Sequence, residues 1–279
     1  MRKAVKSIRM KADFELSNAY VRRVAGDGTA AVADNGPLKL VRLVLKFRSA
    51  LARCLQKAVY RLERPGRSVT PNLLGDRDIE WSWVASQMPS GRGEALDFGS
   101  GGSCLGLIAA QRGYKVTAVD LEPTQWPYVH PHLRFIKGDL LKLPLPAGHF
   151  DLVLNCSTVE HVGLVRRYGV AEDRSDGDLE AMARLKELMK PGGLMLVTIP
   201  VGQDALFAPL CRVYGAQRLP RLLEGYTVEK QDYWIKDNQN RWVLSTKETA
   251  LSFKASAGSW NPLQNVYAPG CFALSKLGS

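Results

Sequence analysis

The chain has 279 residues and a formal net charge of +11, with 46% hydrophobic and 23% charged residues. This composition is ordinary for a globular protein and excludes a disordered or collagen-like chain. No apolar stretch approaches the roughly 20 residues of a membrane-spanning helix, no secretory signal follows the basic start, and the five cysteines are scattered. We therefore expect a cytoplasmic protein without a disulfide framework.

The positive charge is concentrated at the start of the chain. Residues 1–69 contain 16 Lys or Arg and 5 acids, whereas the other 210 residues carry 22 of each sign. We therefore predict two parts, a basic helical extension over 1–69 and a neutral catalytic domain over 70–279.

Residues 37–63 of the extension have the pattern of an amphipathic helix. Apolar side chains recur every three or four residues from Leu40 to Leu62, and Lys or Arg fill the other faces. The plainest interpretation is a helix docked on the domain by its apolar stripe. A helix lying on the inner, anionic membrane surface is the sharper alternative. An acidic partner also stays open, and sparse aromatic residues make nucleic acid the weakest option.

The catalytic domain begins with a predicted helix over 78–86, whose tryptophans Trp81 and Trp83 we assign to packing. A short strand over 94–98 then runs directly into a glycine turn, and 105–112 returns to a helical apolar pattern. Glycines let the backbone turn sharply and approach a ligand closely. The following helix N-terminus offers free N–H groups to an anionic group. Strand, glycine turn and helix in this order predict a ligand site.

The neighbours of the glycine turn indicate which ligand it binds. A dinucleotide fingerprint has a third glycine five residues after the first, but this chain has Cys104 there. The run Asp97-Phe98-Gly99-Ser100-Gly101 instead resembles motif I of class I S-adenosylmethionine (SAM)-dependent methyltransferases. The resemblance implies that this turn packs against the methionine part of SAM, with the acid Asp97 close by.

The ends of the next strands continue the resemblance in the same order. A predicted strand over 114–119 ends at Asp120-Leu121, and one over 133–136 runs into Asp139-Leu140. A carboxylate can accept hydrogen bonds from two neighbouring hydroxyls. The resemblance implies that Asp120, with Leu121, binds the ribose of SAM, and that Asp139 and Leu140 meet its adenine ring. It also places Asn155, at the end of a fourth strand over 150–155, beside the cofactor.

The rest of the domain completes a doubly wound, seven-stranded α/β sheet of the class I methyltransferase type. A helix over 176–189 and Lys190-Pro191-Gly192-Gly193 precede a fifth strand over 194–201. Residues 205–223 are predicted as a helical insert. Segments 226–236 and 266–274 resemble the antiparallel pair that closes a methyltransferase sheet.

Glu160 and His161 follow the fourth strand, at the edge where a methyl acceptor is expected. A hydroxyl acceptor needs a base, and the unperturbed pKa of histidine lies near working pH. Glu160 can orient His161 or bind a divalent ion, but the spacing indicates no third ligand, so we expect no metal site. The alternative is that His161 only caps or packs the next segment. Residues 166–168 lie just beyond, where acceptor recognition is expected.

The resemblance implies a SAM-dependent methyltransferase. We expect O-methylation of a small-molecule or glycan hydroxyl, with His161 as general base. Two alternatives stay open, an N-methyltransferase of small amines and a SAM-binding scaffold recruited by its basic arm.

Overall fold

The computed structural model describes residues 76–124, 126–165, 170, 172–237, 241–256 and 267–276. All of them belong to the predicted catalytic domain, 70–279. The basic extension 1–69, with its predicted helix 37–63, lies outside the described residues, and so do residues 166–168.

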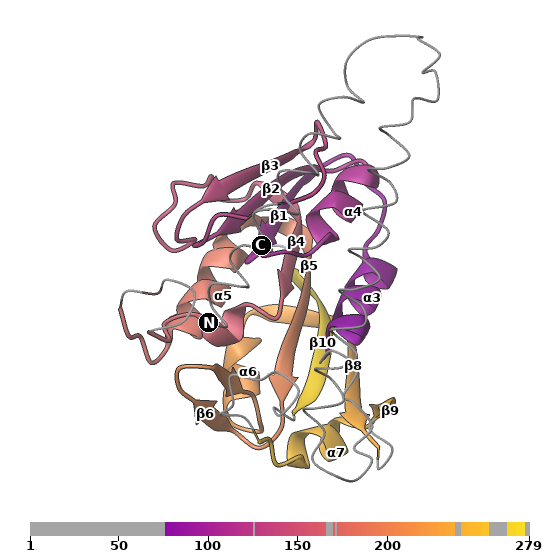
Figure 1. The fold of residues 1–279 in the computed structure, drawn as a ribbon, viewed down its shortest axis with the longest axis vertical. Helices are drawn as coiled ribbons and strands as arrows, with labels where there is room; N and C mark the ends of the chain where they lie inside the picture. The colour runs from indigo at the N-terminus through magenta and orange to yellow at the C-terminus, as the bar shows by residue number, and fades with distance from the viewer. Residues whose placement is uncertain are drawn as a thin grey trace, which may run out of the picture. The chain divides into compact units, whose positions relative to one another are not determined.

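In this part of the chain, eight strands form one sheet in the order β3-β2-β1-β4-β5-β10-β8-β9 (Figure 1). The first five strands in that order run parallel, and β10 lies antiparallel between β5 and β8. The doubly wound α/β sheet and its antiparallel closing pair are thereby confirmed, and β9 adds an edge strand to the seven predicted. The strands are β1 (Glu94–Phe98), β2 (Lys115–Asp120), β3 (Leu133–Lys137), β4 (Phe150–Cys156), β5 (Met189–Val201), β8 (Tyr226–Lys236), β9 (Trp242–Ser245) and β10 (Ala268–Lys276).

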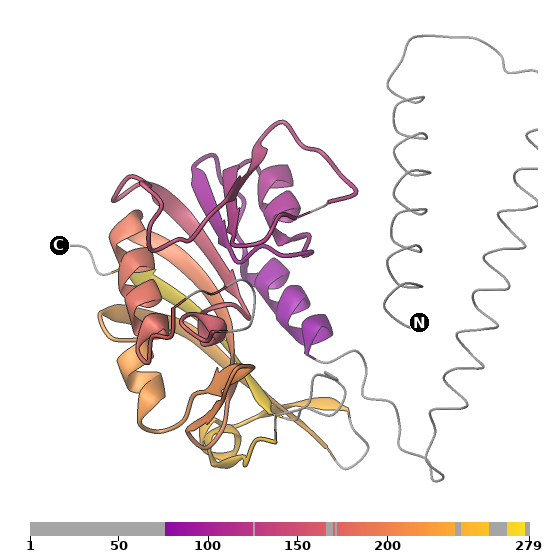
Figure 2. The same ribbon diagram turned by 60° about the vertical axis from the view of Figure 1, so that its left-hand side comes forward.

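Helices cover both faces of the sheet (Figures 1 and 2). Helices α3 and α4 lie on one face, and α5 and α6 lie on the other. The helices of the described residues are α3 (Arg77–Gln87), α4 (Leu105–Gln111), α5 (Gly177–Leu188), α6 (Arg218–Leu222) and α7 (Lys247–Ser252), together with the 3-10 turn η1 (Val159–His161).

Two hydrophobic clusters fill the space between the sheet and its helices. Successive side chains of a strand point to opposite faces, so Ala95 joins the cluster with α3 and α4, while Leu96 joins the cluster with α5. Leu152, Val153 and Leu154 of β4 are all fully buried. Burial on both faces explains why the central strands are continuous apolar runs rather than alternating ones.

The segment 205–223 differs from its prediction as a helical insert. Strands β6 (Ala205–Phe207) and β7 (Cys211–Val213) form an antiparallel hairpin, and within this segment only α6 is helical. Short apolar runs fit a strand as well as a helix, and Pro209 cannot donate to a helical hydrogen bond. The Tyr214 amide instead donates to the Pro200 carbonyl at 3.0 Å, which attaches the hairpin to the end of β5.

Candidate active site

The carboxyl ends of β1, β2 and β4 open onto a cavity of about 620 Å3. Ligands of doubly wound sheets bind at this edge, outside the ends of the parallel strands. The predicted site residues that line the cavity are Asp97, Gly99, Ser100, Gly101, Asp120, Leu121, Asp139, Leu140 and His161. The sheet therefore brings predicted residues from four separate stretches of sequence to one place.

The glycine turn between β1 and α4 depends on the absence of a side chain at Gly99. Its φ is +69°, in the left-handed region that favours glycine. A Cβ there would also lie 2.1 Å from the Cγ2 of Thr158, which follows β4. The turn can therefore pack against the end of β4 only with glycine at this position.

Asp97 and Ser100 place unpaired polar atoms beside the cavity. Each residue is only 2% exposed, and within the described residues Asp97 Oδ2 and Ser100 Oγ have no hydrogen-bond partner. Burial, reinforced by the charge of Asp120, raises the pKa of Asp97 to about 7. Buried polar atoms nearly always have partners, so this pair fits a polar or cationic ligand group.

Backbone amides hold the two other predicted acids in place. Asp120 accepts from the Gly101 amide at 2.9 Å through Oδ2 and from the Glu122 amide at 3.0 Å through Oδ1. Asp139 accepts from the Leu141 amide at 3.0 Å. Each carboxylate oxygen has a second lone pair, so both acids can also accept hydrogen bonds from a ligand.

Two aromatic residues brace the glycine turn, and the sequence analysis did not identify them. Trp126 Nε1 donates to the Gly101 carbonyl at 3.0 Å, and the Tyr128 hydroxyl donates to the Ser103 carbonyl at 2.6 Å. Their rings stack at a centroid distance of 5.6 Å. The only signal in the sequence was their position just after the acid that ends β2.

His161 lines the other end of the cavity and is bound by a segment 49 residues later in the chain. Its Nδ1 lies 2.6 Å from the Leu210 carbonyl. A carbonyl can only accept, which assigns a proton to Nδ1. The Nε2 atom lies 3.4 Å from Glu160 Oε1.

Glu160 is buried directly behind His161. It is 1% exposed, and its Oε1 accepts from the Ser157 hydroxyl at 2.8 Å. Ser157 has a φ of +50°, a conformation that few non-glycine residues adopt. Burial raises the pKa of Glu160 to about 7. Glu160 itself does not line the cavity, so its position suits orientation of His161 more than contact with a ligand.

Helix α3 contributes two residues to the cavity wall, Arg77 and Trp81. Arg77 donates at 2.9 Å to Glu80, which is buried and also accepts from the Thr198 hydroxyl at 2.9 Å. Of the two tryptophans assigned to packing, Trp83 is buried and donates to Asp232 at 2.7 Å. Trp81 also packs against the hydrophobic cluster that contains Trp83, as predicted, and in addition lines the cavity.

Asn155 is the predicted cofactor residue that the structure does not place at the cavity. It is fully buried, and its Nδ2 donates to the Met182 sulfur of α5 at 3.5 Å. The next residue, Cys156, lines the cavity instead. Neighbouring side chains of a strand point to opposite faces. The prediction chose the residue one position before Cys156, and the side chain of that residue, Asn155, points into the core.

The described residues contain no group of three or more His, Cys, Asp or Glu side chains placed to hold a metal ion. Metal independence stays a prediction, and a chelator can test it.

Known proteins resemble this chain in sequence. A family model described as "Caenorhabditis protein of unknown function, DUF268" matches residues 143–256. The "Ubiquinone biosynthesis O-methyltransferase" of Pseudoalteromonas translucida is 26% identical over 185 residues, which cover 63% of this chain and 70% of that protein. The protein of the same name from Pseudomonas aeruginosa is 26% identical over 198 residues, covering 67% and 76%.

A solved structure resembles the chain in fold. The crystal structure of the cyclase SpnF superposes with a TM-score of 0.51 at 16% identity, covering 78% of this chain and 86% of that one. Since one fold serves many reactions, this likeness concerns the architecture alone.

Proposed function

We propose that this chain, a class I Rossmann-like methyltransferase that uses SAM, methylates a hydroxyl group of a small molecule or glycan. The observation that carries the proposal is the position of His161, held at the cavity wall with the proton on Nδ1. Its place at the end of β4 is where the acceptor would meet the methyl group. The name of the relatives as O-methyltransferases supports the same reaction type.

The residues at the glycine-turn end of the cavity fit SAM. The unpaired atoms of Asp97 and Ser100 would meet the amino-acid part, Asp120 the ribose hydroxyls, and Asp139 with Leu140 the adenine ring. A cation such as the SAM ammonium group would give a partner to Oδ2 of Asp97, which accepts no hydrogen bond among the described residues. SAM supplies a methyl group activated by its attachment to a positively charged sulfur.

His161 would act as the general base. Because the Leu210 carbonyl places the ring proton on Nδ1, the lone pair of Nε2 is the proton acceptor. SAM would supply the methyl group to the acceptor oxygen and its sulfur would keep the bonding electron pair, while Nε2 of His161 would take the hydroxyl proton. The histidine becomes a cation in this step, and Glu160 Oε1 at 3.4 Å stabilises its charge.

Residues 37–63 would supply location rather than chemistry. We propose that this basic, amphipathic segment contacts an anionic membrane surface from the cytoplasmic side. None of the described helices is both long and apolar enough to cross a membrane.

The experiment compares His161→Ala with a matched histidine variant, after the acceptor has been identified with labelled SAM in a cell extract. We expect His161→Ala to lower turnover by about 100-fold or more, the usual share of a positioned base, while the affinity for SAM is nearly unchanged. His149→Ala is the control, because His149 lies at the opposite end of β4, where its ring meets Phe150 edge to face. It should leave turnover unchanged.

Three outcomes would contradict parts of the proposal. Full activity of His161→Ala would exclude a base at this position and favour a small amine, which is nucleophilic without one. SAM binding without turnover on any extract would favour a scaffold. Loss of activity with a chelator would make Glu160 and His161 metal ligands.

A further inference from the structure

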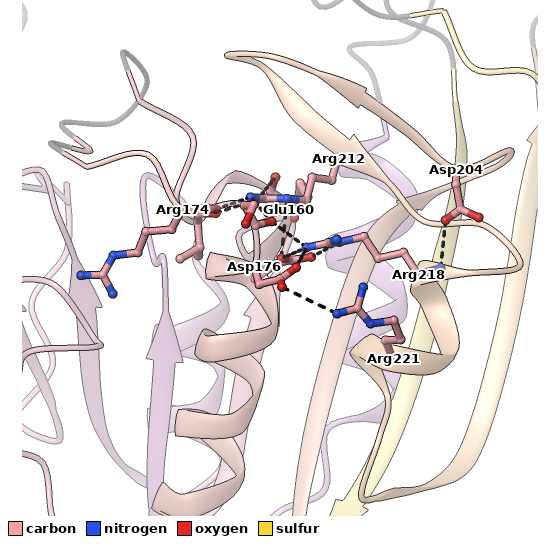
Figure 3. Close-up of polar contacts among 10 residues, drawn as sticks. Glu160, Arg174, Asp176, Asp204, Arg212, Arg218 and Arg221 are labelled. Carbon is pink, nitrogen blue, oxygen red and sulfur yellow. Dashed lines mark hydrogen bonds and ion pairs between the residues drawn. The ribbon is translucent and has the colours of Figure 1, made fainter.

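Arg212, on β7, is a buried arginine whose hydrogen bonds nearly all go to backbone carbonyls. It is 3% exposed. Its Nη1 donates to the Val162 carbonyl at 2.6 Å and the Glu160 carbonyl at 3.4 Å. Its Nη2 donates to the Arg174 carbonyl at 2.9 Å and the Ser175 carbonyl at 3.1 Å. Figure 3 shows the guanidinium group lying between these two segments.

The charge of Arg212 is balanced inside the same network. Its Nε lies 3.6 Å from Asp178 Oδ1, and Asp178 is fully buried near the start of α5. Arg218 donates to the other oxygen of Asp178 at 2.8 Å and also binds Asp176 (Figure 3). A buried arginine with all of its groups partnered holds its neighbours in a fixed geometry, whereas removing it leaves several carbonyls unpaired.

The two segments that Arg212 joins border the part of the cavity beside His161, where the methyl acceptor would bind. We call this part the acceptor end. His161, Val162 and Gly163 line the cavity from one segment, and Glu172 and Arg174 line it from the other. The segments also touch directly, because the Arg174 amide donates to the Gly163 carbonyl at 2.9 Å. A Cβ at Gly163 would lie 2.4 Å from the Arg174 carbonyl oxygen.

The same hairpin also binds the His161 ring. Leu210, two residues before Arg212, supplies the carbonyl 2.6 Å from Nδ1. The β6–β7 hairpin therefore contacts the turn that carries the histidine twice. Leu210 binds the His161 ring, and Arg212 binds the carbonyls of the two neighbouring residues, Glu160 and Val162. Movement of the 160–162 turn relative to the hairpin would break the ring contact.

We infer that Arg212 is a positioning residue, which fixes the turn carrying His161 so that the Leu210 carbonyl holds the ring in its Nδ1-protonated form. This inference rests on the proposed function for its catalytic meaning, but the ring geometry can be measured without an acceptor. Arg212 itself does not line the cavity and would act only through His161 and the 174–175 segment.

The test is nitrogen NMR of the histidine rings in the full chain with S-adenosylhomocysteine bound. In the unmodified protein His161 should show a single form with a proton on Nδ1. In Arg212→Lys the His161 ring should no longer stay in this single form, and its nitrogen signals should be averages over the Nδ1- and Nε2-protonated forms. The reason is that an ammonium group has three donors and cannot bind four carbonyls. The affinity for S-adenosylhomocysteine should change by less than about twofold, since that end of the cavity is distant from Arg212.

Arg218→Lys is the matched control, because Arg218 shares Asp178 and the Ser175 carbonyl but contacts neither Glu160 nor Val162. It should keep the His161 signals of the unmodified chain. Equal changes in both variants, or unchanged signals in Arg212→Lys, would overturn the inference. So would an Nε2-protonated ring in the unmodified protein, a result that does not require any variant to fold. Full activity of His161→Ala would instead overturn only the proposed base.

Discussion

Two buried carboxyl groups near the cavity have pKa values in the neutral range. Burial raises the pKa of Asp97 and of Glu160 to about 7 each. A carboxyl group that titrates near neutral pH can change its charge when a ligand binds or a proton is transferred. Asp97 lines the cavity beside the glycine turn, and Glu160 lies behind His161.

Asp97 should make cofactor binding depend on pH. The ionised carboxylate attracts the ammonium group of the cofactor, and the protonated acid does not. Affinity for S-adenosylhomocysteine should therefore be highest above the pKa of about 7 and fall as the pH is lowered through it. The loss approaches about tenfold per pH unit once the carboxyl group is mostly protonated. Calorimetry between about pH 5.5 and 7.5 measures this slope.

Asp97→Asn is the control for this pH dependence. It should bind more weakly at neutral pH and show a much flatter profile, because the amide does not titrate. The same slope in Asp97→Asn as in the unmodified chain would assign the titration to another group.

At the scale of elements, the turn between β1 and α4 depends on Gly99. Gly99→Ala forces a side chain into the left-handed region and into Thr158, so we expect it to lower the free energy of unfolding by about 3 kcal/mol. It should also weaken SAM binding by more than about tenfold, because the turn lines the cavity. Denaturant unfolding and calorimetry measure the two effects.

Gly148→Ala separates backbone strain from the clash at Gly99. Gly148 also has a positive φ, +58°, but a Cβ there would meet nothing within 4 Å. It should cost only about 1 kcal/mol of stability and leave SAM binding unchanged. If the two variants lose equal stability, the contact with Thr158 is not what requires glycine at position 99.

At the scale of the whole molecule, the basic extension and the neutral catalytic part should be separable. Deleting residues 1–69 should preserve SAM binding, since all the cavity-lining residues in the described part of the chain follow position 76. The deletion should abolish cosedimentation with anionic vesicles at low salt, because each basic residue near such a surface contributes about 1 kcal/mol. High salt should also weaken the binding of the full chain to anionic vesicles, because salt screens the attraction between the charges.

Two results would contradict this membrane interpretation. Full-length protein that stays in the supernatant with anionic vesicles at low salt would exclude membrane attachment. A deleted chain that is insoluble would indicate that the apolar stripe of 37–63 packs on the catalytic domain instead.

Much of the fold could be predicted because its signals are local in sequence. The strand, the glycine turn and the next helix are covalent neighbours, so Asp97 through Gly101 could be assigned before their contacts were known. Asp120, Asp139 and His161 could be placed at the same cavity, because each lies at or after the end of a parallel strand and those ends meet at one edge. Their roles stay predictions. Asn155 could not be placed, since periodicity alone does not show which face of β4 its side chain joins.

The sequence by itself indicated the class of fold, SAM as the cofactor and the edge of the sheet where the cavity lies. Only the tertiary structure decided how the acceptor end is built. Residues 205–213 fit a helix in isolation, and packing against the end of β5 makes them a hairpin. That hairpin brings Leu210 and Arg212 to a turn about 50 residues earlier in the chain, through carbonyl contacts that no side-chain pattern encodes. Backbone carbonyls are the same in every residue, so such contacts leave no trace in the sequence.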